Sequence, residues 1–215
     1  MPANYDKIAG VYDFLSRMVF GGQIVKAQLC LLHFIPAGSR VLIVGGGTGW
    51  ILEQITRQQA SGISIDYVEA SAQMIRISKN RNYGTNNVNF IQLPIEDFTT
   101  TGLYDVILTP FLFDNFKSDK IEVIFKQLHA LLKTNGYWLH VDFFYNENRG
   151  CLWQKLLLKL MYFFFGLICN VEANELVNME EYFATAYQKK MEQAFYFGFI
   201  KSTAYLKTSS TYSKS

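Results

Sequence analysis

A glycine-rich turn between an apolar strand and a helix is the part of this sequence with the clearest chemical meaning. The β-forming run Val41–Val44 leads directly into Gly45–Gly49, and apolar residues at helical spacing resume at Ile51. Glycine tolerates positive φ and lets a ligand lie against the main chain. An acid, Glu69, ends the next apolar segment, 20 residues after Gly49. The strand, turn, helix and acid together predict a bound nucleoside-type ligand, rather than a glycine-rich turn without one.

The spacing of the glycines separates two classes of ligand. A dinucleotide fingerprint, G-x-G-x-x-G, needs a third small residue where this chain has Trp50. The G-x-G-x-G pattern found here, followed by a strand ending in Glu69, resembles the S-adenosylmethionine site of class I methyltransferases. In that family the glycine loop passes under the methionine and ribose, and the acid accepts hydrogen bonds from both ribose hydroxyls. The resemblance implies a cofactor site made of Tyr12, Gly45, Gly46, Gly47, Gly49, Glu69, Ala70, Met74, Ile95, Glu96 and Thr109.

The N-terminal segment carries a more specific likeness. Residues 5–13, Tyr-Asp-Lys-Ile-Ala-Gly-Val-Tyr-Asp, resemble the cap of methyltransferases of the ubiquinone and menaquinone biosynthesis type. In such enzymes a tyrosine often closes over the cofactor, where an aromatic face attracts the sulfonium cation. Tyr12 is our candidate, with plain helix packing by Tyr5 and Tyr12 as the alternative.

One stretch departs from the family. After the predicted strand 88–92 the family has an aspartate beside the adenine, and this chain has Pro94. Either the backbone around Ile95 or the acids Glu96 and Asp97 take over that contact, or both acids face solvent. Met74, expected against the adenine, is equally well explained as a core residue.

A substrate crevice is expected where the fourth and fifth strands end. Strand 105–109 runs into the aromatic loop 110–116, and the carboxyl ends of parallel strands form the binding crevice of an open α/β sheet. We predict Asp114, the one acid in that loop, as a general base whose pKa is raised by apolar surroundings. An N-cap of a turn that leads into the following helix is the alternative role. The predicted substrate pocket consists of Phe111, Phe113, Phe143 and Phe144.

The predicted fold is α/β: a doubly wound, mostly parallel, seven-stranded sheet. Its Rossmann-like methyltransferase form, with a reversed C-terminal strand inserted antiparallel at the sheet edge, is implied by the resemblance. Residues 1–207 form a single domain, with a helical cap at 4–35 interrupted by Gly21-Gly22 and an inserted apolar helix at 151–170. Residues 208–215 are a polar tail.

Composition excludes several functions. The net charge of +2, without any longer basic cluster than Lys189-Lys190, argues against nucleic-acid binding. Three cysteines among apolar neighbours suit reduced thiols in a cytoplasmic protein, and no signal peptide is visible. The three histidines lack partners at metal-ligand spacing, so no metal is expected.

The inserted helix is the most apolar run of the chain. Lys155 and Lys159 share one of its faces and would each cost about 2.5–3.5 kcal/mol near the middle of a bilayer, so stable membrane insertion is not expected. We expect the helix to be covered by the domain, by a second subunit in a homodimer or by a hydrophobic substrate. A position on a membrane surface is the less favoured alternative.

The predicted function is methyl transfer from S-adenosylmethionine to a small, hydrophobic acceptor, and the methyl chemistry itself comes from the family likeness. A non-catalytic S-adenosylmethionine-binding or scaffold protein is the alternative that Pro94 leaves open. An NAD(P)-dependent oxidoreductase is disfavoured by Trp50 and by the lack of a Tyr-x-x-x-Lys pair.

Overall fold

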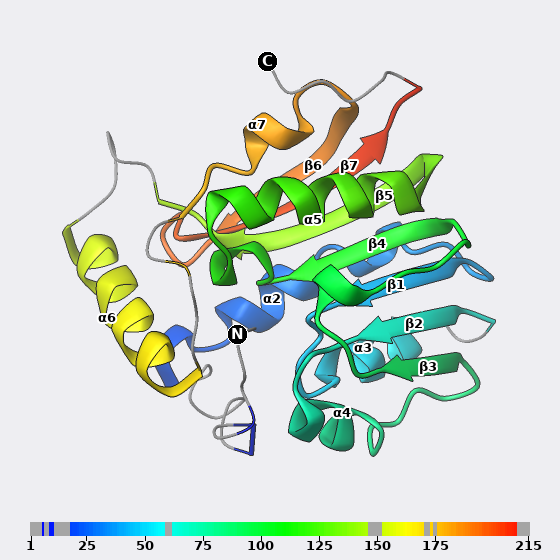
Figure 1. Cartoon of the computed structure of the whole chain (residues 1–215), viewed down its shortest axis with the longest axis horizontal. Helices are drawn as coiled ribbons and strands as arrows, with labels where there is room; N and C mark the ends of the chain where they lie inside the picture. The colour runs from blue at the N-terminus through cyan, green and yellow to red at the C-terminus, as the bar shows by residue number, and fades with distance from the viewer. Residues whose placement is uncertain are drawn as a thin grey trace.

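A seven-stranded sheet organises the computed structural model of the chain (Figure 1). The structure describes Asp6, Ala9, Gly10, Ala173 and residues 18–58, 62–145, 152–169 and 176–209, without the side chains of 163–169. The strand order is β3-β2-β1-β4-β5-β7-β6. The strands are β1 Arg40–Val44, β2 Ser64–Val68, β3 Asn87–Ile91, β4 Tyr104–Pro110, β5 Leu132–Phe143, β6 Tyr187–Phe195 and β7 Ile200–Lys207.

The pairing of the strands confirms the predicted fold class. Strands β3, β2, β1, β4 and β5 pair in parallel, and β7 pairs antiparallel with both β5 and β6. The predicted place of the reversed strand at the sheet edge was wrong. Strand β7 lies inside the sheet, with Ser202–Tyr205 buried, while β6 forms the edge and is exposed along most of its length.

Helices cover both faces of the sheet, as a doubly wound fold requires. Alternate side chains of β1 enter different cores: Val41 and Ile43 join one, and Leu42 and Val44 the other. The first core is completed by α2 and α3, and the second by α5 and α7. The helices are α2 Gln23–Leu29, α3 Trp50–Gln58, α4 Ala72–Ser78, α5 Ser118–Leu131, α6 Leu152–Cys169 and α7 Glu180–Phe183, and the short 3₁₀ turns are η1 Leu32–Phe34, η2 Ile95–Asp97 and η3 Phe113–Asn115.

The junction between α5 and β5 differs from its prediction. The sequence predicts that the helix closes at Asn135-Gly136 and that the strand begins at Tyr137. The helix ends earlier because Leu132 is already extended and pairs with Tyr104. Regular pairing with β4 then resumes at Tyr137, after a shift of register within β5 where Asn135 adopts a φ of 63°.

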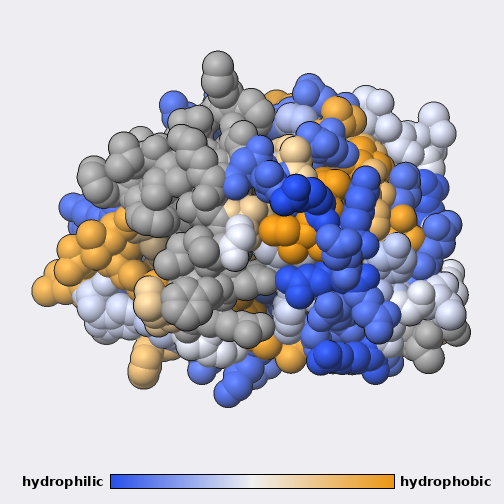
Figure 2. All heavy atoms as spheres, turned by 90° about the horizontal axis from the view of Figure 1, so that it is seen from below, coloured by the Kyte–Doolittle hydropathy of each residue, from blue (hydrophilic) through white to orange (hydrophobic). Residues whose placement is uncertain are grey.

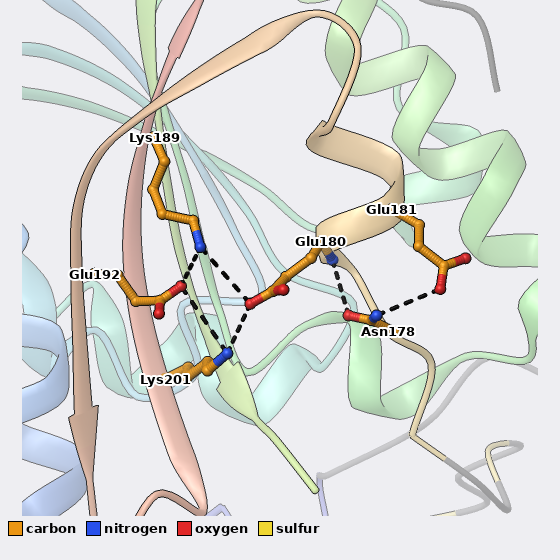
Figure 3. Close-up of polar contacts among 6 residues, drawn as sticks. All are labelled: Asn178, Glu180, Glu181, Lys189, Glu192 and Lys201. Atoms are coloured by element: carbon orange, nitrogen blue, oxygen red, sulfur yellow. Dashed lines mark hydrogen bonds and ion pairs between the residues drawn. The ribbon is translucent and has the colours of Figure 1, made fainter. Parts of the chain in front are cut away.

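A group of ion pairs ties α7 to the β6–β7 hairpin (Figure 3). The Glu180 carboxylate accepts from Lys201 at 2.6 Å and lies 3.8 Å from Lys189, and both lysines also face Glu192. The Lys201 ammonium stands 3.7 Å from the centre of the Phe144 ring. This network therefore fixes Phe144, just past the end of β5, against the hairpin.

Helix α6 follows β5 in the chain and lies past the carboxyl ends of the strands (Figure 1). Leu157, Leu158 and Met161 pack against the first core, whereas Leu152 and Leu156 are exposed. Among the described residues, no helix combines the length and apolarity needed to cross a bilayer.

The last glycine of the turn has a packing role. Gly49 has a φ of +74°, and a Cβ there would lie 2.5 Å from the Cβ and 2.8 Å from the Cα of Ser78, the last residue of α4. Ser78 is fully buried and its backbone cannot move aside cheaply. The absence of a side chain at Gly49 therefore allows α3 to begin directly against α4.

Gly49→Ala is expected to lower the free energy of unfolding by about 2–4 kcal/mol, since it combines overpacking with an unfavourable φ. Gly38→Ala is the matched control, because Gly38 has a φ of +71° and open space within 4 Å. That control should cost only about 1–2 kcal/mol. Urea unfolding of both variants measures the difference, and equal losses would contradict the packing role.

Candidate functional site

A cavity opens at the carboxyl ends of β1, β2 and β4, where an open α/β sheet binds its ligands. The loops after β1, β2, β3 and β4 form most of its wall, and one face of α2 completes it. The described lining residues are Gly21, Ile24, Val25, Gln28, Val44, Gly45, Gly46, Gly47, Thr48, Trp50, Ile51, Val68, Glu69, Ala70, Met74, Leu93, Pro94, Ile95, Glu96, Pro110, Phe111, Leu112, Asn115 and Phe116.

Two side chains at the end of β2 hold the glycine loop, one through the N–H and the other through the carbonyl of Gly47. The Gly47 N–H donates to Glu69 Oε2 at 3.0 Å, and the Tyr67 hydroxyl donates to the Gly47 carbonyl at 2.9 Å. Gly45 and Gly47 both have positive φ, 70° and 63°. A Cβ on Gly46 would fall 2.5 Å from the Tyr67 ring, whereas a Cβ on Gly47 would meet nothing within 4 Å. Gly46 is thus required by packing, and Gly47 presents bare backbone next to open space.

Glu69 is a buried carboxylate at the edge of the cavity, with 8 % of its surface exposed. Its Oε1 accepts the Ser71 N–H at 2.9 Å, while Oε2 holds Gly47. Burial raises the pKa of Glu69, and the N–H groups of Ser71, Gly47 and Ala70 act in the opposite direction. A carboxylate has about four lone-pair positions, so the two direct bonds leave acceptor capacity for a ligand hydroxyl.

The start of α4 brings the N-terminal segment to this site. The sequence predicts Ser71 as the N-cap of this helix, and in the structure its hydroxyl accepts the Met74 N–H at 3.1 Å. The Asp6 carboxylate accepts the Gln73 N–H at 3.0 Å and the Ser71 hydroxyl. Asp6, whose role the sequence did not indicate, therefore docks beside Glu69. Tyr12, the predicted aromatic lid, lies outside the described residues.

The wall after β3 contains the departure from the family pattern. Pro94, Ile95 and Glu96 line the cavity, and Asp97 is exposed outside it. The Ile95 carbonyl already accepts from Gln127 at 3.0 Å, and the Glu96 carboxylate lies 3.8 Å from Lys120. Of the two acids that stood as candidates here, only Glu96 is within the lining. Its contact with a cofactor stays a prediction.

The end of β4 forms the opposite wall and is conformationally strained. Phe111 has a φ of 51°, an uncommon value for a bulky residue, while its N–H donates to the Val141 carbonyl at 2.7 Å. The Asn115 side chain closes the turn by donating to the Phe111 and Leu112 carbonyls at 3.0 and 3.2 Å. Phe111 and Asn115 both line the cavity, so this strain shapes the wall.

Two acids come together behind this wall. Asp142, on β5, accepts the Phe113 N–H at 3.0 Å and the Phe143 N–H at 2.8 Å, and only 5 % of it is exposed. Burial raises the pKa of Asp142 to about 7, against the effect of these backbone donors. Burial and the charge of Asp142 raise the pKa of Asp114 well above its usual range. The pair therefore retains proton affinity near neutral pH.

Asp114 lies next to the cavity lining and is not an N-cap. It lies inside η3, whose N-cap is Leu112, and α5 is capped at Lys117, so Asp114 caps neither the turn nor the helix. It also lies outside the cavity lining, but Asn115, which lines it, donates to Asp114 Oδ1 at 2.8 Å. Asp142 was not predicted, because on the sequence it is one polar residue within an apolar strand.

Several predicted site residues lie behind the lining. Thr109 is fully buried and its Oγ1 accepts the Trp138 indole N–H at 3.0 Å, because its side chain points into the second core rather than the crevice. Phe113 packs 5.7 Å from the His140 ring for the same reason. Phe143 stands 5.0 Å behind Phe111. Of the predicted substrate aromatics, only Phe111 reaches the cavity, and the remaining residues placed outside it are Gly49, Thr109, Phe113, Phe143 and Phe144.

Comparison with known proteins agrees with this geometry. Residues 41–136 match a methyltransferase domain family. This match agrees with the resemblance of the glycine loop and Glu69 to class I, S-adenosylmethionine-dependent methyltransferases. The matched stretch begins inside β1 and ends inside β5, so it contains the glycine loop, Glu69 and the wall after β4.

Two curated methyltransferases are similar in sequence to this chain. The ubiquinone/menaquinone biosynthesis C-methyltransferase UbiE of Geotalea uraniireducens is 28 % identical over 145 residues, 65 % of this chain and 61 % of the relative. The malonyl-[acyl-carrier protein] O-methyltransferase of Halalkalibacterium halodurans is 32 % identical over 107 residues, 48 % of this chain and 38 % of that protein. The chain thus spans 61 % or less of the length of these two relatives.

Solved structures share the fold of the methyltransferase domain. Magnesium protoporphyrin IX methyltransferase from Synechocystis, solved with bound SAH, superposes with a TM-score of 0.62 at 13 % identity, over 86 % of this chain and 82 % of that one. The cyclopropane synthase MmaA2 from Mycobacterium tuberculosis gives a TM-score of 0.63 at 14 % identity, over 85 % and 82 %.

The acid pair predicts a pH dependence of stability. Because burial raises the folded-state pKa of Asp142 to about 7, the folded state binds a proton that the unfolded chain releases near pH 4. The free energy of unfolding should therefore fall as pH rises from about 4 to 7, by up to about 1.4 kcal/mol per pH unit for each such proton. Asp142→Asn should flatten this slope, measured by urea unfolding at several pH values.

The matched control is Asp97→Asn, which removes an exposed carboxylate from η2. It should leave the slope of the wild type unchanged. A wild-type slope that persists in Asp142→Asn would show that this acid is not the one that retains its proton.

Proposed function

We propose that the protein transfers a methyl group from S-adenosylmethionine to a small, hydrophobic acceptor. The observation that carries the proposal is the Gly47 peptide, clamped by Glu69 and Tyr67 next to open space at the edge of the cavity. It joins bare backbone to a carboxylate with free acceptor capacity, the two groups that a nucleoside with a charged tail requires.

The residues of the cavity fit this cofactor. Glu69 would accept hydrogen bonds from the ribose hydroxyls, and the backbone of Gly45–Gly47 would lie along the methionine part. Ala70, Met74 and Ile95 offer an apolar slot for the adenine, in line with their places in the lining. When bound, S-adenosylmethionine supplies a methyl group made electrophilic by a sulfonium.

The part of the cavity wall that we assign to the methyl acceptor is apolar except for one side-chain carboxamide. Leu112 and the ring of Phe111 stand together with the Asn115 carboxamide at the end of β4, and the α2 residues Ile24 and Val25 add further apolar surface. Such a wall removes water from the reacting atoms and aligns a hydrophobic acceptor. A small molecule with one polar group beside Asn115 suits this composition.

Asp114 is the proposed acceptor of the proton that a hydroxyl nucleophile loses. It adjoins the cavity: its Oδ1 accepts the side-chain N–H of Asn115 at 2.8 Å, and Asn115 belongs to the lining. Its pKa is raised toward neutral pH, and a general base works best when its pKa lies near the working pH. Asp142 has a positioning role, because it holds the Phe113 N–H at the turn that carries Asp114.

Pro94 supports one competing function, a protein that binds the cofactor without turning it over. Pro94 and Ile95 offer an apolar wall in place of the family's aspartate. A first experiment, which separates both of these functions from an NAD(P)-dependent oxidoreductase, is a thermal-shift measurement with S-adenosylhomocysteine and with NAD. Methyl transfer requires a rise in melting temperature with the former and none with NAD, and stabilisation by NAD alone would overturn the proposal.

Glu69→Gln is expected to weaken the binding of S-adenosylhomocysteine by about 1.5–3 kcal/mol, the scale of hydrogen bonds to a charged group. Tyr67→Phe is the matched control, since it removes the other tether of Gly47 without removing a predicted ligand contact. It should cost only about 0.5–1.5 kcal/mol. Calorimetric titration measures both variants, and equal losses would mean that Glu69 acts through the loop alone.

Gly47→Val is expected to abolish binding of S-adenosylhomocysteine, because its side chain would occupy open space at the cavity edge and disfavour the φ of 63°. Gly38→Val has a similar φ, +71°, far from the cavity, and controls for backbone strain. The control should bind normally in the same titration. Normal binding by Gly47→Val would place the cofactor elsewhere.

A further inference from the structure

Helix α6 exposes an apolar stripe that the methyltransferase site does not use. Leu152, Trp153, Leu156 and Leu160 fall on one side of the helix and are 87, 39, 60 and 55 % exposed. We call this set the α6 stripe. Figure 2 shows hydrophobic residues gathered at the end of the molecule where Figure 1 places α6. None of the four lines the cavity.

The α6 stripe continues onto the β6–β7 turn and the segment before α2. The Trp153 ring lies 5.6 Å from that of Tyr196 and 5.9 Å from that of Phe197, which is 87 % exposed. The Tyr196 hydroxyl donates to the Val19 carbonyl at 3.0 Å, next to Met18, which is 65 % exposed. Three segments far apart in sequence thus share one apolar surface.

Contacts on the inner face of α6 fix the orientation of this surface. The Gln154 side chain is buried and donates to the Phe197 carbonyl at 3.0 Å, and Leu157 and Leu158 pack against the first core. The exposure of the α6 stripe therefore follows from how the helix is seated on the domain. Contiguous apolar surface of this kind marks an interaction site.

The charge on α6 identifies the partner. The sequence from Leu152 to Cys169 contains Lys155 and Lys159 and no acid, and both lysines are exposed beside the stripe. A second copy of the chain packed here about a two-fold axis would bring these like charges together without an acid on the helix to neutralise them. An anionic lipid surface suits both features, since leucine and tryptophan enter the headgroup boundary while lysines reach the phosphates.

We propose that the α6 stripe, with Phe197 and Met18, docks the protein on an anionic membrane surface, with α6 lying in the plane of the interface. Gly21, two residues after Val19, lines the cavity, so the docked surface adjoins the site. A hydrophobic acceptor dissolved in the bilayer would then lie close to the methyl-transfer site. That link rests on the proposed function, whereas docking does not.

Sedimentation of the full chain with lipid vesicles tests the proposal. The two probes are vesicles of phosphatidylcholine alone and of phosphatidylcholine with about one third phosphatidylglycerol. We expect binding to the anionic vesicles that weakens with added salt. Leu156→Gln with Leu160→Gln should reduce the partition coefficient at least about tenfold. Lys155→Glu with Lys159→Glu should reduce it on the order of 20-fold on anionic vesicles only.

The matched controls make the same kinds of substitution, a charge reversal or the loss of an exposed apolar side chain, at sites away from α6. Arg57→Glu with Lys79→Glu makes the same charge change on α3 and after α4, and Val123→Gln removes a 63 % exposed apolar residue from α5. Both controls should bind vesicles like the wild type. Far-UV circular dichroism and melting temperature establish that every variant is folded.

Failure of the wild type to bind anionic vesicles, or equal binding by the α6 variants and their controls, would overturn the proposal. A dimer in light scattering that Leu156→Gln with Leu160→Gln dissociates would assign the surface to a second copy instead. Vesicle binding without any melting shift from S-adenosylhomocysteine would leave docking in place and reject the proposed function.

Discussion

The site depends on one peptide being held from two sides. Strand β2 pairs with β1 in parallel, with Val44 opposite Val68, so the residues at the end of β2 reach the loop that leaves β1. From there Tyr67 holds the Gly47 carbonyl and Glu69 holds its N–H. A loop with positive φ at Gly45 and Gly47 would otherwise lose its conformational freedom without compensating bonds. The strand register thus creates both the loop conformation and the place of the acid.

A second constraint operates where β4 and β5 end. The bond from the Phe111 N–H to the Val141 carbonyl carries the β4–β5 ladder one step beyond β4, into a residue with a φ of 51°. The next residue of β5, Asp142, holds the Phe113 N–H and so fixes the turn bearing Asp114. Backbone bonds thus fix the buried Asp142 and the half-buried Asp114, which desolvation and mutual repulsion disfavour as charged groups. Strain, burial and charge are concentrated at one wall of the cavity, as is typical of functional sites.

Helix α6, at the periphery, is less completely buried than the central strand β1. In β1 both faces are covered, whereas α6 covers part of the first core and leaves its own outer stripe exposed. The lysines on that helix would be costly inside a bilayer, and they suit the proposed contact with anionic headgroups. The described residues of α6 therefore lie outside the cavity lining.

The sequence by itself determined the doubly wound α/β fold, the glycine loop, Glu69 and the Ser71 cap. These features rest on local signals: runs of apolar β-formers, glycine where φ is positive, and a hydroxyl at a helix start. The tertiary structure alone decided which side chains face the cavity. Thr109 and Phe113 turn into the second core, while Gly21, Ile24 and Asn115 line the cavity and Asp142 lies next to Asp114. The direction of a side chain at the end of a strand depends on its register with neighbouring strands, and those contacts join residues distant in sequence.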